Sequence, residues 1–256
     1  MFLARAAIGG VIAFAVFALR GEKFLPPAER VRFVVVALGV IILFPLFIAL
    51  ALQRVPSSHA AVVTGILPLA TAIAGAFFLG ERHGILFWVS AIAGSGVVTL
   101  FSLWKSGGNF SSDDFYLLLS VISAAVGYAE GGRLARIYGG PAVISWCLIG
   151  FLPASAVFVG VTFRTAYLDA PLWAWGGLFY TGIFSVYLGF FAWYRGLSEG
   201  GVGRVGQVQL LQPFLTLLFS GWLFGERIEP VFFFTALLVA FFILIGRFSS
   251  KPRSRR

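Results

Sequence analysis

The sequence predicts an all-α membrane protein made of two inverted-topology repeats of five transmembrane helices, with the leading helix absent from the first repeat. Composition is the first reason: 59% of the 256 residues are hydrophobic, only 11% are charged, and the mean hydropathy is +0.95. No soluble domain could keep so much apolar surface out of water. The second reason is a motif that returns 145 positions later in the chain.

This motif begins with a proline and ends in Gly-Glu-Arg. Its residues are Pro68, Gly80, Glu81 and Arg82 in the first copy, and Pro213, Gly225, Glu226 and Arg227 in the second. Both copies lie in apolar segments long enough to cross a bilayer, so the duplication indicates a membrane architecture rather than a soluble repeat array. We expect the prolines to act as hinges, and the Gly-Glu-Arg ends to cap, orient or gate their helices.

Nine apolar segments follow one another along the chain, separated by short charged or Gly/Pro-rich breaks. They are residues 2–19, 33–52, 58–80, 85–104, 114–136, 141–163, 171–195, 204–225 and 230–248. Their lengths suit helices that cross about 30 Å of hydrocarbon. Since backbone groups cannot stay unpaired in lipid, helices are the expected structure.

The positions of basic residues predict the orientation. With a cytoplasmic C-terminus, 14 basic residues fall in inner loops and the tail, against 5 at outer positions. Such an excess marks the cytoplasmic side. The net charge of +9 is concentrated in this tail, so anionic lipid explains it better than nucleic acid, which we do not expect as a partner.

The 145-residue offset also predicts the domain organisation. Residues 1–104 form the first repeat with four helices, 105–248 the second repeat with five, and 249–256 a basic cytoplasmic tail. A unit with an odd number of helices inserts its second copy in the opposite sense, which gives inverted repeats. We attribute the missing helix to genuine loss or to a misassigned start codon. A secretory signal in residues 1–19 is the weaker alternative, because Arg5 is its only leading basic residue.

The mid-helix proline, the Gly-Glu-Arg ending and the following glycine-rich stretch 93–98 (Ala-Gly-Ser-Gly-Val-Val) together resemble the EamA-type family of the drug/metabolite transporter superfamily. The resemblance covers nearly the whole chain. It implies ten helices in two inverted five-helix units, and export or import of small metabolites by alternating access. The missing first helix is the departure from that pattern.

A carboxylate inside the fifth predicted helix is the leading candidate for proton coupling or substrate contact. Glu130 lies within an apolar segment, where an ionised group is costly unless it is paired, protonated or facing water. Tyr128, two residues earlier, belongs to the same candidate site. The alternative is local, since Arg133 at i+3 could pair with Glu130 and only stabilise a helix end.

Amides and tyrosines on two later helices complete the candidate site. Gln209 and Gln212 share one face beside Pro213, which frees a carbonyl about one turn earlier. The alternative role for these amides is hydrogen bonding between helices. Tyr180 and Tyr187 begin a seven-residue series that continues at Tyr194 and predicts one stripe along a helix face, lining a cavity or packing.

The predicted function is secondary transport, as an exporter of a small organic metabolite, by alternating access of the two repeats around a midplane cavity and with proton coupling through Glu130. The partners are then a small-molecule substrate and the lipid bilayer of an inner or plasma membrane, with a homodimer kept as one form of assembly. A non-transporting membrane subunit or scaffold is the alternative. No catalytic cluster, nucleotide motif or metal-ligand pattern is present, so we expect no enzyme, cofactor or metal.

Overall fold

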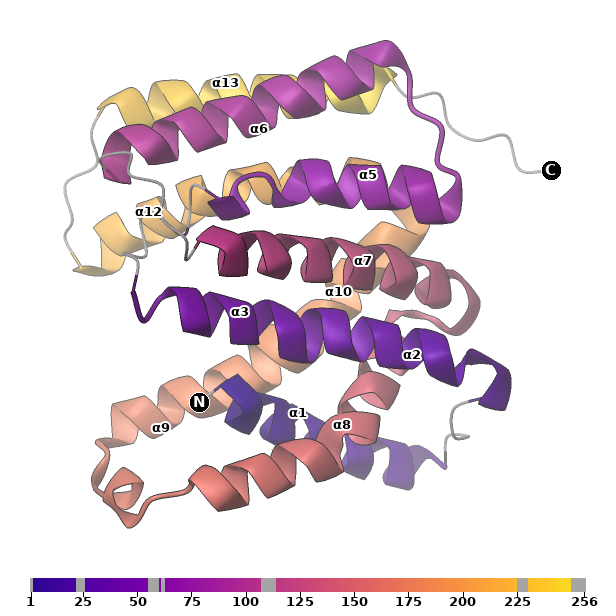
Figure 1. Cartoon of the computed structure of the whole chain (residues 1–256), viewed down its shortest axis with the longest axis vertical. Helices are drawn as coiled ribbons and strands as arrows, with labels where there is room; N and C mark the ends of the chain where they lie inside the picture. Colours follow the sequence, from indigo (N-terminus) through magenta and orange to yellow (C-terminus); the bar gives the residue numbers. More distant parts are fainter. Residues whose placement is uncertain are drawn as a thin grey trace. The chain divides into compact units, whose positions relative to one another are not determined.

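The structure is a computed structural model, and it describes residues 2–21, 26–54, 60, 63–106, 114–224 and 230–249. All regular elements within these ranges are helical (Figure 1). Seven helical segments of this part are long and apolar enough to cross a membrane. They are Leu3–Arg20, Arg30–Ala51, Ile85–Trp104, Asp114–Tyr138, Gly140–Thr162, Leu172–Gly200 and Pro230–Arg247. The all-helical membrane fold expected from the sequence is therefore confirmed.

The chain forms two compact units, and each combines segments from both sequence repeats. Unit 1 comprises Met1–Leu46 and Val126–Glu199, and unit 2 comprises Phe47–Ala125 and Gly200–Arg256. Each unit therefore brings together segments that lie 145 positions apart. Equivalent segments of the two repeats therefore belong to the same unit, although they are far apart in the chain.

In unit 1, helix α1 (Phe2–Arg20) packs against α8 (Gly140–Thr162) and against the segment η4 (Thr181–Leu188). Glycines make this approach close. A methyl group on Gly10 would lie 3.0 Å from the carbonyl oxygen of Leu148, and one on Gly182 would lie 2.9 Å from Cγ2 of Ile8. Small residues at helix crossings are a common device in membrane proteins, because they let two backbones come together.

Two transmembrane segments that lie mainly in unit 1 contain a π-helical stretch at equivalent positions of the two repeats. One runs through α2 (Arg30–Val36), the π-helix η2 (Ala37–Leu43) and α3 (Phe44–Ala51). The other runs through α9 (Leu172–Tyr180), the π-helix η4 and α10 (Gly189–Gly200). A shift of 145 positions places η2 onto η4. π-Helical turns are rare and are frequently found at functional sites.

Unit 2 contains α5 (Leu67–Leu79), α6 (Ile85–Ser106), α11 (Val202–Gly206), the 3₁₀ segment η5 (Gln207–Leu211), α12 (Gln212–Phe224) and α13 (Pro230–Ser249). Helices α6 and α13 lie side by side (Figure 1). A buried cluster holds them together with the broken helix η5–α12. Its members are Val98, Phe101, Leu210, Phe214, Phe232 and Val239.

The two proline-containing segments are not long continuous α-helices in the described residues. Helix α5 has only 13 residues, and the predicted span 204–225 is divided among α11, η5 and α12. Pro213 has no N–H to donate to the carbonyl of Gln209, so the α-helical pattern fails one turn before the proline. The tighter η5 turn occupies this position.

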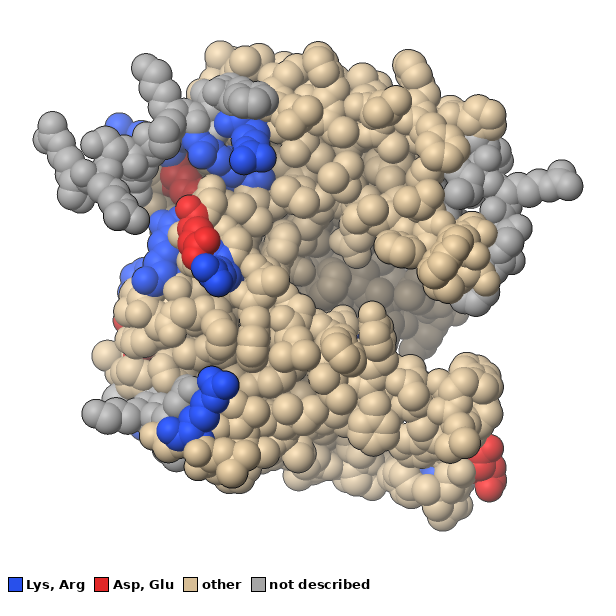
Figure 2. All heavy atoms as spheres, turned by 180° about the vertical axis from the view of Figure 1, so that it is seen from behind, with Lys and Arg blue, Asp and Glu red and all other residues tan. Residues whose placement is uncertain are grey.

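The outer surface is mostly apolar, as the composition requires. Figure 2 shows broad regions without acidic or basic side chains, with blue and red atoms gathered in small groups. Exposed large hydrophobic residues occur along most of the spans, including Phe77 at 80% and Leu237 at 72% exposure. Such a surface is compatible with lipid contact and would be unfavourable in water.

Candidate functional site

A cavity of about 150 Å³ in unit 1 lies against both π-helical segments. We call it the polar cavity, and its lining consists of Arg5, Ala6, Val40, Ile41, Phe44, Tyr128, Ser185, Val186 and Phe190. Val40 and Ile41 come from η2, whereas Ser185 and Val186 occupy the equivalent positions of η4. The two repeats thus contribute matching positions to a single cavity.

The polar cavity lies at the level of the middle of two membrane spans. Val40 and Ile41 are near the centre of Arg30–Ala51, and Ser185 is near the centre of Leu172–Gly200. The Arg5 guanidinium therefore faces a mid-span cavity. A charged side chain at such a depth is costly and usually serves a function. Among the described residues, no carboxylate lies within 4.0 Å of it.

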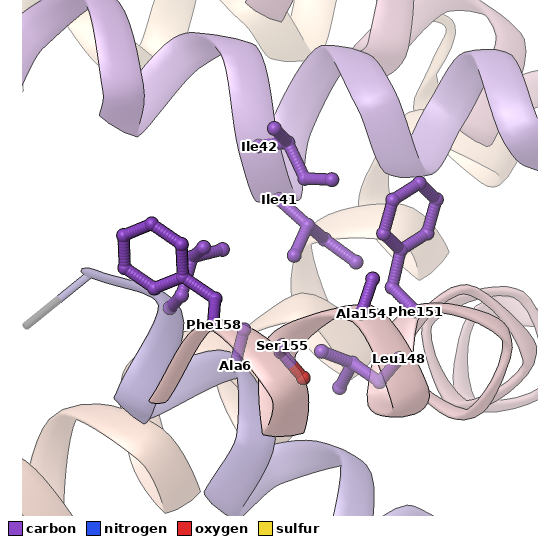
Figure 3. Close-up of a pocket in the computed structure, with 9 residues that line it drawn as sticks. Ala6, Ile41, Ile42, Leu148, Phe151, Ala154, Ser155 and Phe158 are labelled. Carbon is purple, nitrogen blue, oxygen red and sulfur yellow. The ribbon is translucent and has the colours of Figure 1, made fainter. Parts of the chain in front are cut away.

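A second cavity of about 120 Å³ adjoins the first, and we call it the apolar cavity. The two share Ala6 and Ile41. Figure 3 shows the side chains that converge on it from the η2 helix and from α8. Its lining is Leu3, Ala6, Ile41, Ile42, Leu148, Phe151, Ala154, Ser155 and Phe158. The Ser155 hydroxyl donates to the carbonyl of Leu152 at 3.0 Å, so it is already bonded within its helix.

Glu130 lies on α7 (Asp114–Tyr138), half a turn beyond the cavity residue Tyr128, and it is paired with two arginines. Its Oε1 is 3.3 Å from Nε of Arg32 on α2 and 3.6 Å from a terminal nitrogen of Arg133. Arg32 also donates to Glu29 at 2.8 Å. The Glu130 side chain is only 12% exposed. The local pair with Arg133 exists, and a second pair joins α7 to α2.

The three tyrosines of the predicted stripe have different environments. Tyr187 is buried and its hydroxyl is 3.1 Å from that of Ser145, while Tyr194 is completely buried and packs against Gly131. Tyr180, in contrast, is 62% exposed and stacks on Phe184. The π-helix between Tyr180 and Tyr187 has a wider turn, so the seven-residue spacing no longer returns to one face. The expectation of one continuous stripe is wrong at Tyr180.

The glutamines of the broken helix lie in unit 2 and do not line the polar cavity. Gln207 is buried and donates to the carbonyl of Pro68 at 3.1 Å, which ties η5 to α5. Gln209 has a buried side-chain oxygen without a hydrogen-bond partner in the described residues, whereas Gln212 is exposed. Gln207 was not a predicted site residue, and its bond to Pro68 is an interaction between equivalent helices of the two repeats.

The first Gly-Glu-Arg motif forms a defined cap. Gly80 ends α5 in the left-handed conformation with a φ of 64°, as is usual for a glycine that terminates a helix. The Glu81 carboxylate accepts hydrogen bonds from the backbone N–H groups of Val202 and Gly203, both at 2.9 Å. Glu81 thus satisfies two N–H groups at the start of α11, and Arg82 is exposed. The second motif, Gly225, Glu226 and Arg227, lies outside the described residues.

Of the predicted candidates, only Tyr128 lines the polar cavity, and Glu130 stands next to it on the same helix. Sequence reasoning missed Arg5 and Ser185. Arg5 is the fourth residue of the apolar segment 2–19, so its place in the sequence does not show how deep it lies. Two signals could have marked this site. One is the charged Arg5 at the start of an apolar segment, and the other is the polar Ser185 at the position equivalent to Val40.

Comparisons with known proteins agree with this architecture. The family model described as the EamA-like transporter family matches residues 1–103 and 111–246. The chain is 42% identical over 228 residues to "Uncharacterized transporter YdeK" of Bacillus subtilis, which covers 88% of this chain and 78% of that protein. It is 24% identical over 207 residues to "Uncharacterized transporter sll0355" of Synechocystis sp., which covers 74% of this chain and 62% of that protein.

A solved crystal structure also superimposes on the chain. The TM-score is 0.77 at 20% sequence identity, and the match covers 96% of this chain and 88% of the other. At this level of identity the likeness concerns the fold alone.

Proposed function

Because the chain belongs to the EamA-like transporter family, we propose that it is a secondary transporter that exports a small organic metabolite by alternating access of its two repeats. The family and the transporter names of its relatives support membrane transport in general. The excess of basic residues in the predicted inner loops supports a cytoplasmic C-terminus in an inner or plasma membrane.

The polar cavity is the observation that carries this proposal. In repeat-based transporters the substrate lies near the bilayer midplane, where irregular helices from the two repeats meet. Here η2 and η4 are equivalent, are both π-helical, and both line the polar cavity at mid-span level.

The contact between Glu130 and Arg32 is the proposed gate on the side of the cavity nearer the Arg30 end of the α2 span. It joins α7 to α2, and it involves the same two spans that contribute Tyr128 and Val40 to the polar cavity. The charged groups that face Glu130 are Arg32 and Arg133, with Glu29 bound to the far side of Arg32. Protonation of Glu130 would remove the negative charge that holds both arginines, and this is the proposed route to proton coupling.

Transport itself is tested with purified full-length protein in liposomes. A panel of labelled organic acids, amino acids and nucleobases is offered in counterflow assays, with protein-free liposomes as the control for passive permeation. Protein-dependent exchange of at least one solute is the expected result, and loading of inside-out vesicles would give the direction. A protein that inserts and folds but exchanges no solute would favour a non-transporting membrane subunit.

Proton coupling is tested with Glu130→Gln, which keeps the shape of the side chain and removes its titration. We expect transport that no longer depends on pH, with unchanged membrane insertion. Glu199→Gln is the matched control, because Glu199 pairs with Arg195 at 2.9 Å in an exposed position. Retention of the wild-type pH profile in Glu130→Gln would remove the proton-coupling proposal and leave the transport proposal intact.

A further inference from the structure

The two cavities of unit 1 adjoin, but their linings differ in chemical character. Both linings include Ala6 and Ile41, so the two cavities are direct neighbours. The polar cavity presents a guanidinium and two hydroxyl-bearing side chains. The apolar cavity presents aliphatic and aromatic groups, and its single hydroxyl, that of Ser155, is bonded within α8. The combined lining has a polar end and an apolar end.

The polar end carries a positive charge without a negative partner. Arg5 has no carboxylate within 4.0 Å in the described part of the chain, and Ser185 has no hydrogen-bond partner there. An uncompensated cation at mid-span depth is unfavourable, so a ligand that supplies the negative charge would bind with a strong electrostatic gain. The planar guanidinium matches a carboxylate in particular, because it can donate two parallel hydrogen bonds to it.

The dimensions of the cavities limit the size of the ligand. Their volumes of about 120 and about 150 Å³ are each well below the roughly 300–1,000 Å³ of sites that hold drug-sized molecules. Phe151 and Phe158 of the apolar cavity suit a short hydrocarbon or aromatic group. The lining therefore favours a small solute over a large drug.

Resting on the transport function proposed above, the geometry points to a small carboxylic acid with an apolar body as the substrate class. Its carboxylate pairs with Arg5 and accepts a hydrogen bond from the hydroxyl of Ser185, and its apolar part enters the cavity in front of Phe151 and Phe158. This assignment distinguishes the two repeats, since the position equivalent to Ser185 in the first repeat is the apolar Val40.

Equilibrium binding to the purified full-length protein, measured by titration calorimetry in detergent near neutral pH, tests the assignment without depending on transport. The probes are 3-phenylpropanoate, the corresponding amide, the corresponding amine and acetate. The acid should bind about 10- to 100-fold more tightly than the amide, the range expected for a charge-assisted hydrogen bond. Acetate, which lacks the apolar body, should bind more weakly than 3-phenylpropanoate.

Variants identify the group responsible. Arg5→Gln should abolish the preference for the acid over the amide, while Arg5→Lys, which keeps the charge, should retain part of it. Ser185→Val introduces the residue found at the equivalent position of the other repeat, and it should weaken acid binding by a smaller factor. Arg164→Gln is the matched control, because Arg164 is exposed between α8 and the next helical turn, and it should bind the acid as the wild type does.

The outcomes separate this inference from the transport proposal. Equal binding of acid and amide, tighter binding of the amine, no binding of the acid, or an unchanged preference in Arg5→Gln would each overturn the assignment of a carboxylate. Counterflow of a neutral or cationic solute by the same preparation would then still support transport. Selective acid binding without any counterflow would instead support the ligand assignment and contradict transport.

Discussion

Two sets of polar side chains, one in each unit, are accommodated inside the helical packing in different ways. In unit 2, Glu81 accepts two backbone N–H groups and Gln207 donates to a backbone carbonyl, so these side chains connect one helix to another. In unit 1, Arg5 and Ser185 face a cavity and have no ion-pair or hydrogen-bond partner in the described residues. A satisfied buried polar group stabilises the fold, whereas an unsatisfied one beside a cavity remains available to a ligand. The comparison assigns a structural role to one set and a binding role to the other.

The largest stability loss is expected for Glu81→Ala. The substitution leaves the N–H groups of Val202 and Gly203 without their acceptor, in a side-chain environment that is only 9% exposed. Hydrogen bonds to a charged acceptor contribute about 1.5–3 kcal/mol each, so we expect the loss of two to cost about 3–6 kcal/mol. The midpoint of thermal unfolding in detergent measures it. Glu199→Ala, at an exposed ion pair, should change the midpoint little, and equal midpoints for both variants would contradict the structural role of Glu81.

A smaller loss is expected for Gly206→Ala, at the crossing of α5 and α11. A methyl group there would lie 2.8 Å from Cγ2 and 3.2 Å from Cβ of Thr71, which is completely buried. Overpacking of this kind costs about 1–3 kcal/mol. Gly96→Ala on α6 is the control, because a methyl group at Gly96 meets nothing within 4 Å. Its unfolding midpoint should be unchanged or raised, and a comparable decrease in both variants would show that the crossing is looser than described.

Gln207→Leu should cost about 1 kcal/mol, since it removes one hydrogen bond between neutral groups and leaves the Pro68 carbonyl with one partner fewer. Solute binding should be nearly unaffected. A large decrease in affinity with a normal unfolding midpoint would instead place the ligand at the broken helix, as the sequence originally suggested.

The smallest stability effect is expected for Arg5→Gln. It breaks no ion pair in the described residues and removes a charge from mid-span, so the unfolding midpoint should stay the same or rise. A marked decrease would mean that Arg5 holds the helices of unit 1 together, and the contrast between the two sets of side chains would then fail.

Much of the fold could be predicted from the sequence, because the signals are local or periodic. Apolar length marks the spans, the 145-residue offset reveals the duplication, and Pro213 marks the break in its helix. The π-helical segments could not be predicted, since their residues are ordinary apolar ones and the wider turn depends on tertiary packing. For the same reason the stripe through Tyr180 failed.

The candidate site was predicted less well, because depth and pairing depend on neighbouring helices. Glu130 was identified as an intramembrane carboxylate, but its partner Arg32 is nearly a hundred positions away in the chain. Gln209 and Gln212 were predicted as site residues from their spacing alone. They lie in unit 2, whereas the polar cavity lies in unit 1. Arg5 was overlooked because its position in the chain gives no indication of its depth.

Site-specific labelling tests most directly whether the solute binds in the polar cavity. Cys147 is the single cysteine and is buried, so Cys147→Ala gives a background for Ser185→Cys in the cavity and Gln212→Cys on the broken helix. The rate of modification by a water-soluble maleimide is measured with and without a saturating concentration of the tightest-binding acid. We predict that the acid slows labelling of Ser185→Cys and leaves Gln212→Cys unchanged. Protection of Gln212→Cys with unaltered labelling of Ser185→Cys would contradict the assignment of the binding site to unit 1.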